Sequence, residues 1–306
     1  MENVLITGLN GFIGSNLCHH LANNGYTVHG VDINQPQFEL PEGVEYYTRD
    51  LTALPKLPDV DAIVHLAAHS QVQPVAENLG LAIENIEMTR HVLNEAERMG
   101  AFVVNASSRD VYGSSIRPKE EDVTPNSPNG YAMSKLSSES LANSYRHTRG
   151  VSVTSLRLAN VYGPKDLNQR VIPTFIALAE GGEELTVYGE GKLLDFIHID
   201  DICRAIYRTI RRSAIVEGEA INVGSGTGVP LQEIASYISA YIESCPGWSV
   251  TTDRMGDVSQ YVSNLSKANA LLDFEPKIPL SGGLESTVDW YLNNPDQLSS
   301  IQSEVQ

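Results

Sequence analysis

The chain has 306 residues, of which 38 are acidic and 21 basic, so its net charge at pH 7 is −17. This charge argues against nucleic acid or an anionic membrane as a partner, and an apolar fraction of 42% excludes general disorder. No apolar run is long enough for a transmembrane helix, and three scattered cysteines argue against a disulfide framework or a metal site, so we expect a cytoplasmic protein without metal.

Short apolar runs alternate with amphipathic stretches over the first 160 residues. We expect strands at residues 4–7, 27–31, 62–66, 102–106 and 152–158, and helices at residues 15–24, 82–99 and 131–149. This alternation is typical of right-handed βαβ units, and it predicts an α/β fold with a doubly wound parallel sheet.

The pattern loosens after residue 164. We expect helices at residues 172–179, 202–211, 231–242 and 284–292, separated by glycine-rich turns. We interpret residues 165–306 as mainly a smaller, mixed α/β lobe, and the resemblance described below implies that this lobe binds substrate. Residues 1–164, with a returning stretch at about 195–225, form the first domain, and the polar tail after Pro295 is expected to fray.

Glycines at positions 8, 11 and 14 join the first expected strand to the first expected helix. Such glycines allow a tight turn, close backbone approach and tight helix packing, with the helix N-terminus facing a pyrophosphate. Because the motif lies between a strand and a helix, the context that it requires, it predicts a dinucleotide site.

Asp32 ends the second expected strand. A carboxylate at this place binds an adenosine ribose and repels a 2′-phosphate, which favours NAD over NADP. The structural alternative is a turn residue at a strand end. Asp50 and Leu51, which follow the next expected strand, are weaker candidates for the adenine edge.

Tyr131 and Lys135 lie four residues apart, on one face of an expected helix. A nearby cation favours the phenolate and lowers the pKa of a tyrosine, which makes it a usable base near neutral pH. Ser108 follows the fourth strand, and active sites of such sheets lie at the carboxyl ends of the strands. The alternative is that all three are ordinary surface or strand-end residues.

Eight stretches in this chain resemble the nucleotide-sugar epimerase/dehydratase family of extended short-chain dehydrogenases/reductases, which includes enzymes like UDP-glucose 4-epimerase. They are residues 7–14, 65–68, 107–113, 131–135, 156–164, 195–201, 222–226 and 254–257. The resemblance implies a Rossmann domain that binds NAD, a nucleotide-sugar substrate, and a homodimer formed through helices at residues 82–99 and 136–149.

By position, the resemblance implies that Tyr131 is the catalytic base, that Lys135 lowers its pKa and holds the nicotinamide ribose, and that Ser108 binds the 4-oxygen of the sugar. The cofactor-binding residues that it implies are Gly8, Asn10, Gly11, Phe12, Ile13, Gly14, Asp32, Asp50, Leu51, Leu66, Ala67, Ala68, Tyr131 and Lys135.

The resemblance also places Asn160 and Arg254 at the substrate diphosphate. Leu194 stands where the family usually has an arginine that reaches the phosphates, so Arg170 or Arg254 is expected to replace that arginine.

Arg109 and Asp110 depart from the family pattern. Dehydratase and decarboxylase relatives carry a glutamate at the position of Asp110, as the base for the C5 proton, and 4,6-dehydratases carry an acid at the position of Arg109. The main expectation is NAD-dependent C4 epimerisation of a UDP-hexose through a 4-keto intermediate. The alternatives are a dehydratase or decarboxylase with Asp110 as base, and a non-catalytic dinucleotide-binding sensor. Simple pairing of Arg109 with Asp110 is the structural alternative.

Overall fold

A parallel sheet of seven strands organises the larger lobe in this computed structural model, which describes residues 1–252 and 258–305. Its strands, in spatial order, are β11 (Ala220–Val223), β7 (Val153–Leu158), β5 (Phe102–Ser108), β4 (Ala62–His65), β1 (Asn3–Thr7), β2 (Thr27–Asp32) and β3 (Glu45–Thr48). Neighbouring strands all run parallel. The predicted doubly wound sheet is therefore confirmed.

Helices cover both faces of this sheet because its strands send alternate side chains to opposite sides. Val4 and Ile6 belong to the core under α1 (Phe12–Asn23) and α6 (Ile199–Arg211). Leu5, which lies between them, belongs to the core under α3 (Leu79–Met99) and α4 (Gly130–Arg149). The shorter α-helices are α2 (Val72–Glu77), α7 (Ser213–Val216) and α9 (Ser266–Leu272). Three short 3₁₀ helices are η1 (Leu51–Ala53), η2 (Arg109–Tyr112) and η3 (Glu120–Asp122).

The two helices α3 and α4 have sharply defined ends. Asn78 caps α3 by accepting a hydrogen bond from the backbone N–H of Gly80, and Asn129 caps α4 in the same way from Ala132. Each helix ends at a left-handed glycine, Gly100 at φ 69° and Gly150 at φ 70°. These caps fix where α4 begins, and therefore where its first side chains point.

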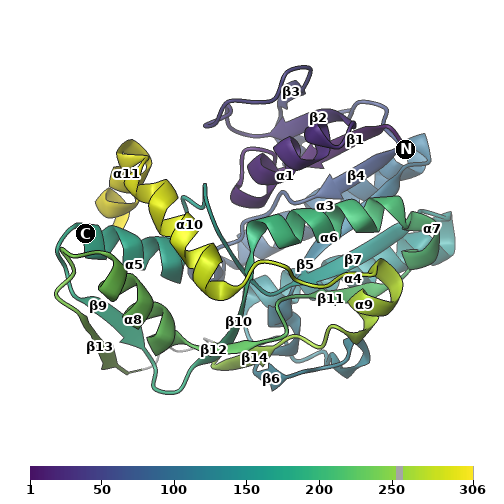
Figure 1. Cartoon of the computed structure of the whole chain (residues 1–306). Helices are drawn as coiled ribbons and strands as arrows, with labels where there is room; N and C mark the ends of the chain where they lie inside the picture. The colour runs from purple at the N-terminus through teal and green to yellow at the C-terminus, as the bar shows by residue number, and fades with distance from the viewer. Residues whose placement is uncertain (253–257, 306) are drawn as a thin grey trace.

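The smaller lobe lies beside the large sheet, to the left in Figure 1. Its sheet contains β12 (Gly228–Pro230), β10 (Leu193–His198), β14 (Gln260–Val262) and β6 (Ser115–Ile116), with β8 (Asn160–Tyr162) also paired to β10, and a separate pair joins β9 (Leu185–Tyr188) to β13 (Trp248–Thr251). Its own core contains side chains from α5 (Val171–Glu180), α8 (Leu231–Tyr241), α10 (Leu280–Leu292) and α11 (Pro295–Val305).

The expectation that the tail frays is wrong. Residues after Asn294 form α11, and Leu298 and Ile301 are buried in the core of the smaller lobe. These two apolar residues lie three apart, on one face of the helix, which is enough to bury the helix against a neighbour. The returning stretch also divides: α6 and β11 join the larger lobe, whereas β10 pairs with strands of the smaller one.

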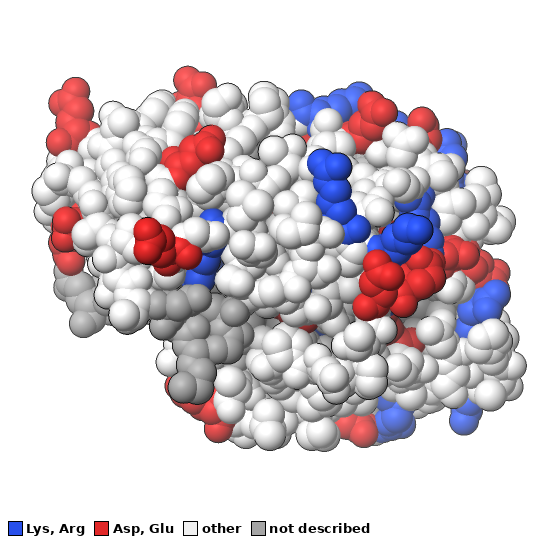
Figure 2. Space-filling view, turned by 90° about the horizontal axis from the view of Figure 1, so that it is seen from below, with Lys and Arg blue, Asp and Glu red and all other residues white. Residues whose placement is uncertain are grey.

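Charges on the surface are of mixed sign. Figure 2 shows acidic and basic side chains gathered together on the right of the face seen from below, with a mostly uncharged centre. Among the described residues, no helix is long and apolar enough to cross a membrane.

Candidate active site

The glycine-rich turn lies where the strand order of the large sheet reverses, between β1 and β4. Gly8 has φ 72°, and a Cβ atom on it would lie 2.7 Å from the backbone nitrogen of Ala67 at the end of β4. A Cβ on Gly14 would lie 2.2 Å from the carbonyl oxygen of Gly8. Within the described chain, no side chain caps α1 at Gly11, so its first N–H groups are available to an anion. The turn therefore fits a dinucleotide pyrophosphate.

Asp32 ends β2 beside this turn. Its Oδ2 accepts a hydrogen bond from the backbone N–H of Asn10 at 3.1 Å, and its Oδ1 accepts one from Asn34 at 3.1 Å. Asp32 is thus a strand-end turn residue, and each carboxylate oxygen keeps a second lone pair for a ribose hydroxyl. The ribose contact stays a prediction.

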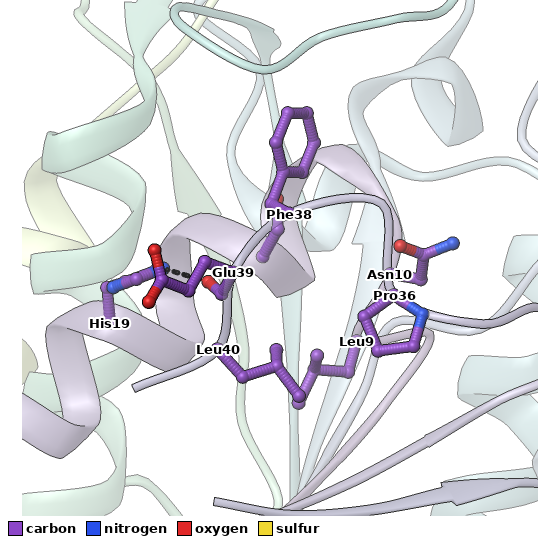
Figure 3. A pocket seen from close by; sticks show the side chains of 8 residues that line it. Leu9, Asn10, His19, Pro36, Phe38, Glu39 and Leu40 are labelled. Atoms are coloured by element: carbon purple, nitrogen blue, oxygen red, sulfur yellow. Dashed lines mark hydrogen bonds between the residues drawn. The ribbon is translucent and has the colours of Figure 1, made fainter. Parts of the chain in front are cut away.

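The chain after Asp32 folds back over the glycine-rich turn. Figure 3 shows the resulting hollow, in which His19 lies beside Glu39, Leu9 beside Leu40, and Asn10 beside Pro36. The backbone N–H of Gln37 donates to Asn10 Oδ1 at 2.7 Å. Phe38 also contacts the Trp290 ring of α10, with ring centroids 6.2 Å apart, so this segment touches both lobes.

Asp50 and Leu51 have structural roles of their own. Asp50 caps η1, and its Oδ1 accepts from both the backbone N–H and the hydroxyl of Thr52. The side chain of Leu51 is buried in the core below α3, so only its backbone is available to a ligand. Their predicted contact with adenine is untested.

A buried chain of polar groups links the end of β1 to α4. His65 Nδ1 lies 2.8 Å from Thr7 Oγ1, and its Nε2 lies 3.2 Å from Thr89 Oγ1. Thr89 in turn lies 3.0 Å from Ser138 Oγ. Burial lowers the pKa of His65 to about 3, so the ring is neutral. Sequence analysis gave His65 no role, although its motif, residues 65–68, carried part of the resemblance.

Tyr131 is the second residue of α4 and lies near the carboxyl end of β5, where Ser108 hydrogen-bonds to it. The start of the helix packs closely on its neighbours, since a Cβ on Gly130 would lie 2.7 Å from Leu79 Cδ2. Lys135 is one turn further on, with Nζ 5.7 Å from the centre of the Tyr131 ring. The structure thus brings together the three residues of the predicted catalytic set.

The expected lowering of the Tyr131 pKa by Lys135 is wrong for the protein alone. Burial raises the pKa of Tyr131 to about 12, and Asp110 raises it further, while Arg170, the Ser108 hydrogen bond and Arg109 oppose the rise.

Lys135 Nζ, 5.7 Å from the centre of the Tyr131 ring, donates a hydrogen bond of 2.9 Å to the carbonyl oxygen of Ala106. Burial lowers the pKa of Lys135 to about 8, although Glu139 opposes this shift. The lysine is therefore held by β5 and α4, at a place where small changes in its surroundings alter its charge near neutral pH.

Arg109 and Asp110 pair with each other, so the structural alternative is confirmed at this point. Arg109 Nε lies 3.2 Å from Asp110 Oδ1, and Asp110 Oδ2 accepts from the Ser108 hydroxyl at 3.2 Å. Arg109 Nη2 donates to Asn160 Oδ1 at 3.1 Å, and Asn160 Nδ2 donates to the carbonyl of Asp195. Asn160 therefore orients Arg109, and its predicted contact with a diphosphate is untested.

Arg170 immediately precedes α5 and reaches toward the first domain. Its Nη1 lies 3.7 Å from Asp166 Oδ2, and its Cζ lies 5.8 Å from the centre of the Phe12 ring. Arg254 lies outside the described residues. Leu194, where the family usually has an arginine, is buried in the core of the smaller lobe.

A second ion pair lies behind the site, and sequence analysis missed it. Arg157 on β7 and Glu139 on α4 form two hydrogen bonds, of 2.9 Å and 2.7 Å, with side chains only 5% and 7% exposed. Ser107 also donates to Glu139. Arg157 Nη1 donates to the Tyr112 hydroxyl and to the carbonyl of Glu120. One signal was available: an arginine inside a strand of a buried parallel sheet needs a buried partner.

Comparison with known proteins places this geometry among related enzymes. The family described as "NAD dependent epimerase/dehydratase family" matches residues 4–224. A dTDP-glucose 4,6-dehydratase from Streptomyces antibioticus is 29% identical over 95% of this chain and 93% of its own.

Two solved structures share the whole fold. An epimerase from Methanothermobacter thermautotrophicus has a TM-score of 0.92 and 30% identity, over 97% of this chain and 94% of its own. A UDP-glucose 4-epimerase from Thermus thermophilus in complex with NAD has a TM-score of 0.85 and 26% identity, over 95% and 99%.

Proposed function

Because the chain belongs to the NAD dependent epimerase/dehydratase family, we propose that it inverts C4 of a UDP-linked hexose through a 4-keto intermediate. The observation that carries this proposal is the meeting of Ser108, Tyr131 and Lys135 at the carboxyl end of β5. An intact set of this kind also disfavours a non-catalytic dinucleotide-binding sensor.

The cofactor is NAD, on which the family depends. When bound, it would supply a reversible hydride acceptor for C4 of the sugar. We propose that the turn from Gly8 to Gly14 holds its pyrophosphate, that Asp32 holds its adenosine ribose, and that Leu66, Ala67 and Ala68 line its path at the end of β4. The close approach of Ala67 to Gly8 supports this placement.

In this proposal Tyr131 removes the proton of the 4-hydroxyl and later returns it. Its position in the first turn of α4 favours the phenolate, because the helix N-terminus is positive. The Ser108 hydroxyl favours it as well when it turns its one proton from Asp110 to the phenolate oxygen. Ser108 would then share the 4-oxygen with Tyr131.

The alternative reaction uses Asp110 as a base at C5, for dehydration or decarboxylation. Against it, both oxygens of Asp110 are engaged, one by Arg109 and one by Ser108. Removal of the C5 proton would require Asp110 to rearrange at least one of these contacts. We therefore favour epimerisation, with Asp110 as an electrostatic neighbour of Tyr131.

The remaining parts of the proposal concern substrate and assembly. Arg170, Asn160 and Arg254 would bind the diphosphate, and residues 165–306 would supply most of the substrate lobe. We also propose that the protein is cytoplasmic and that it forms a homodimer through α3 and α4. Two apolar side chains on α3 support the homodimer, since Leu79 is 58% exposed and Ile83 is 54% exposed.

Incubation with several nucleotide sugars in deuterium oxide tests the reaction. We expect a C4-inverted product without deuterium at C5, because C4 epimerisation removes no proton from C5. Asp110→Asn should retain turnover within about tenfold, the effect of a lost local contact rather than of a lost base. Its rate profile should extend to lower pH, since Asp110 raises the pKa of Tyr131. Deuterium at C5, with an inactive Asp110→Asn variant, would assign the alternative reaction.

A further inference from the structure

Arg109 carries an unsatisfied donor into the site. Its side chain is 13% exposed, and two of its nitrogens are held by Asp110 and Asn160. The third nitrogen, Nη1, is buried, and none of residues 1–252 or 258–305 offers it an acceptor. A buried donor without a partner is costly, so folded proteins rarely leave one without a purpose.

The direction of this nitrogen is fixed. A guanidinium is planar, and here Nε and Nη2 are both engaged while Cζ lies 5.8 Å from the centre of the Tyr261 ring. Rotation to satisfy Nη1 within the protein would break one of these contacts. The acceptor for Nη1 therefore comes from outside the described residues, and a ligand bound beside Tyr131 can supply it.

The open nitrogen lies next to the groups that act on the sugar. Arg109 is close enough to Tyr131 to lower the pKa of its phenol, and it directly follows Ser108 in the chain. Arg170, whose Nη1 lies 3.7 Å from Asp166 Oδ2, is a second cation that lowers the pKa of Tyr131, whereas Asp110 raises it. The surroundings of the reacting carbon thus favour an anionic substituent on the sugar.

We propose that Arg109 Nη1 binds a carboxylate carried by the sugar ring, so that the preferred substrate is a nucleotide-linked hexuronic acid rather than a neutral hexose. This inference rests on the proposed function, since it assumes that Tyr131 and Ser108 surround C4. A guanidinium is suited to the task because it stays charged and its N–H groups match the geometry of carboxylate oxygens. Asp110 and Asn160 are then positioning residues that orient Arg109.

Equilibrium binding to the NAD-loaded protein tests this inference independently of turnover. By calorimetry, UDP-glucuronate should bind at least about tenfold more tightly than UDP-glucose, the scale of one charge-assisted hydrogen bond. Arg109→Gln should abolish this preference and leave the affinity for UDP-glucose within about twofold. Arg109→Lys, which keeps the charge but loses the planar fork, should retain only part of it.

Arg170→Gln is the matched control. It removes the other cation near Tyr131 and should weaken both sugars equally. Equal binding of the two sugars by the unmodified protein, no binding of UDP-glucuronate, or equal weakening of both by Arg109→Gln would overturn the inference. A binding preference that persists when neither sugar is epimerised would uphold it and refute the proposed reaction instead. NAD content and the unfolding midpoint of each variant show whether it is folded.

Discussion

Two buried arginines in this chain illustrate two uses of the same side chain. Arg157 and Arg109 each pair with a carboxylate near the end of β5. Every nitrogen of Arg157 has a partner, from Glu139, Tyr112 and the backbone of Glu120. Arg109 has one nitrogen without any partner in the described part of the chain. The fully paired Arg157 stabilises the fold, whereas the partly paired Arg109 keeps one nitrogen available to a ligand.

The difference between these two networks follows from what surrounds them. The pair of Arg157 and Glu139 lies between α4 and the sheet, where nothing but protein can satisfy it. The pair of Arg109 and Asp110 lies beside Tyr131, where a substrate has to fit. Mutations in the first network should therefore change stability, and mutations around the second should change binding and rate.

Replacement of Arg157 by leucine should give the largest effect. It leaves Glu139 buried without a cation, so the free energy of unfolding should fall by about 3–5 kcal/mol. Urea unfolding measures the change. Arg149→Leu, which breaks an exposed pair with Glu97, is the control and should leave the midpoint unchanged. If the two variants unfolded alike, the complete network would not stabilise the fold.

Tyr131→Phe tests the second network, in which Arg109 and Asp110 lie beside Tyr131 and mutations should change rate rather than stability. It should leave the unfolding midpoint and NAD binding intact while turnover falls by about 10²–10⁴, the scale of a lost acid–base group. Steady-state kinetics and cofactor titration separate the two effects. A variant with near-normal turnover would remove Tyr131 from the reaction.

His65 contacts α4 through Thr89 and Ser138, and its burial should make stability depend on pH. Its folded pKa of about 3 lies below the ordinary value of 6.5, so between these values the unfolded chain binds more protons. Stability should be full above pH 6.5 and decline toward pH 3, by up to about 1.4 kcal/mol per pH unit. His65→Gln cannot titrate and should flatten this decline, as unfolding curves over the pH range would reveal. Parallel curves for the two proteins would contradict a neutral, buried His65.

Asp32→Ala should give the smallest effect, since Asp32 acts at one end of the cofactor. The preference for NAD over NADP should narrow by about tenfold, or roughly 1.4 kcal/mol, the size of one ionic contact near a surface. Fluorescence titration with both cofactors measures it. Tighter binding of NADP than of NAD by the unmodified protein would refute the role of Asp32.

The sequence predicted the fold well where the pattern was local. Five strands of the large sheet and the three principal helices between them were predicted, because buried parallel strands are apolar and the helices amphipathic. The helical tail was missed, since Leu298 and Ile301 are sparse apolar residues whose burial depends on partners far away in the chain.

The candidate site also has features that the sequence predicted and features that depend on the folded chain. The set of Ser108, Tyr131 and Lys135 was predictable from motif and spacing, whereas the orientation of Lys135 toward Ala106 was not. The partner of Glu139 lies on a different element, 18 residues away along the chain. Which nitrogen of Arg109 stays open depends on Asn160, 51 residues away, and this is a property of the folded chain alone.

The boundary between the two networks falls between successive residues of β5. Ser107 gives its hydroxyl to Glu139, and Ser108 gives its hydroxyl to Asp110. Substitutions from position 108 to position 110 can therefore alter the chemistry while the ion pair behind the strand stays whole. In evolutionary terms, mutations in three consecutive codons can change the reaction while the free energy of unfolding that the Arg157–Glu139 pair contributes is kept. This separation suits a scaffold whose descendants diverge in substrate and reaction while they keep one architecture.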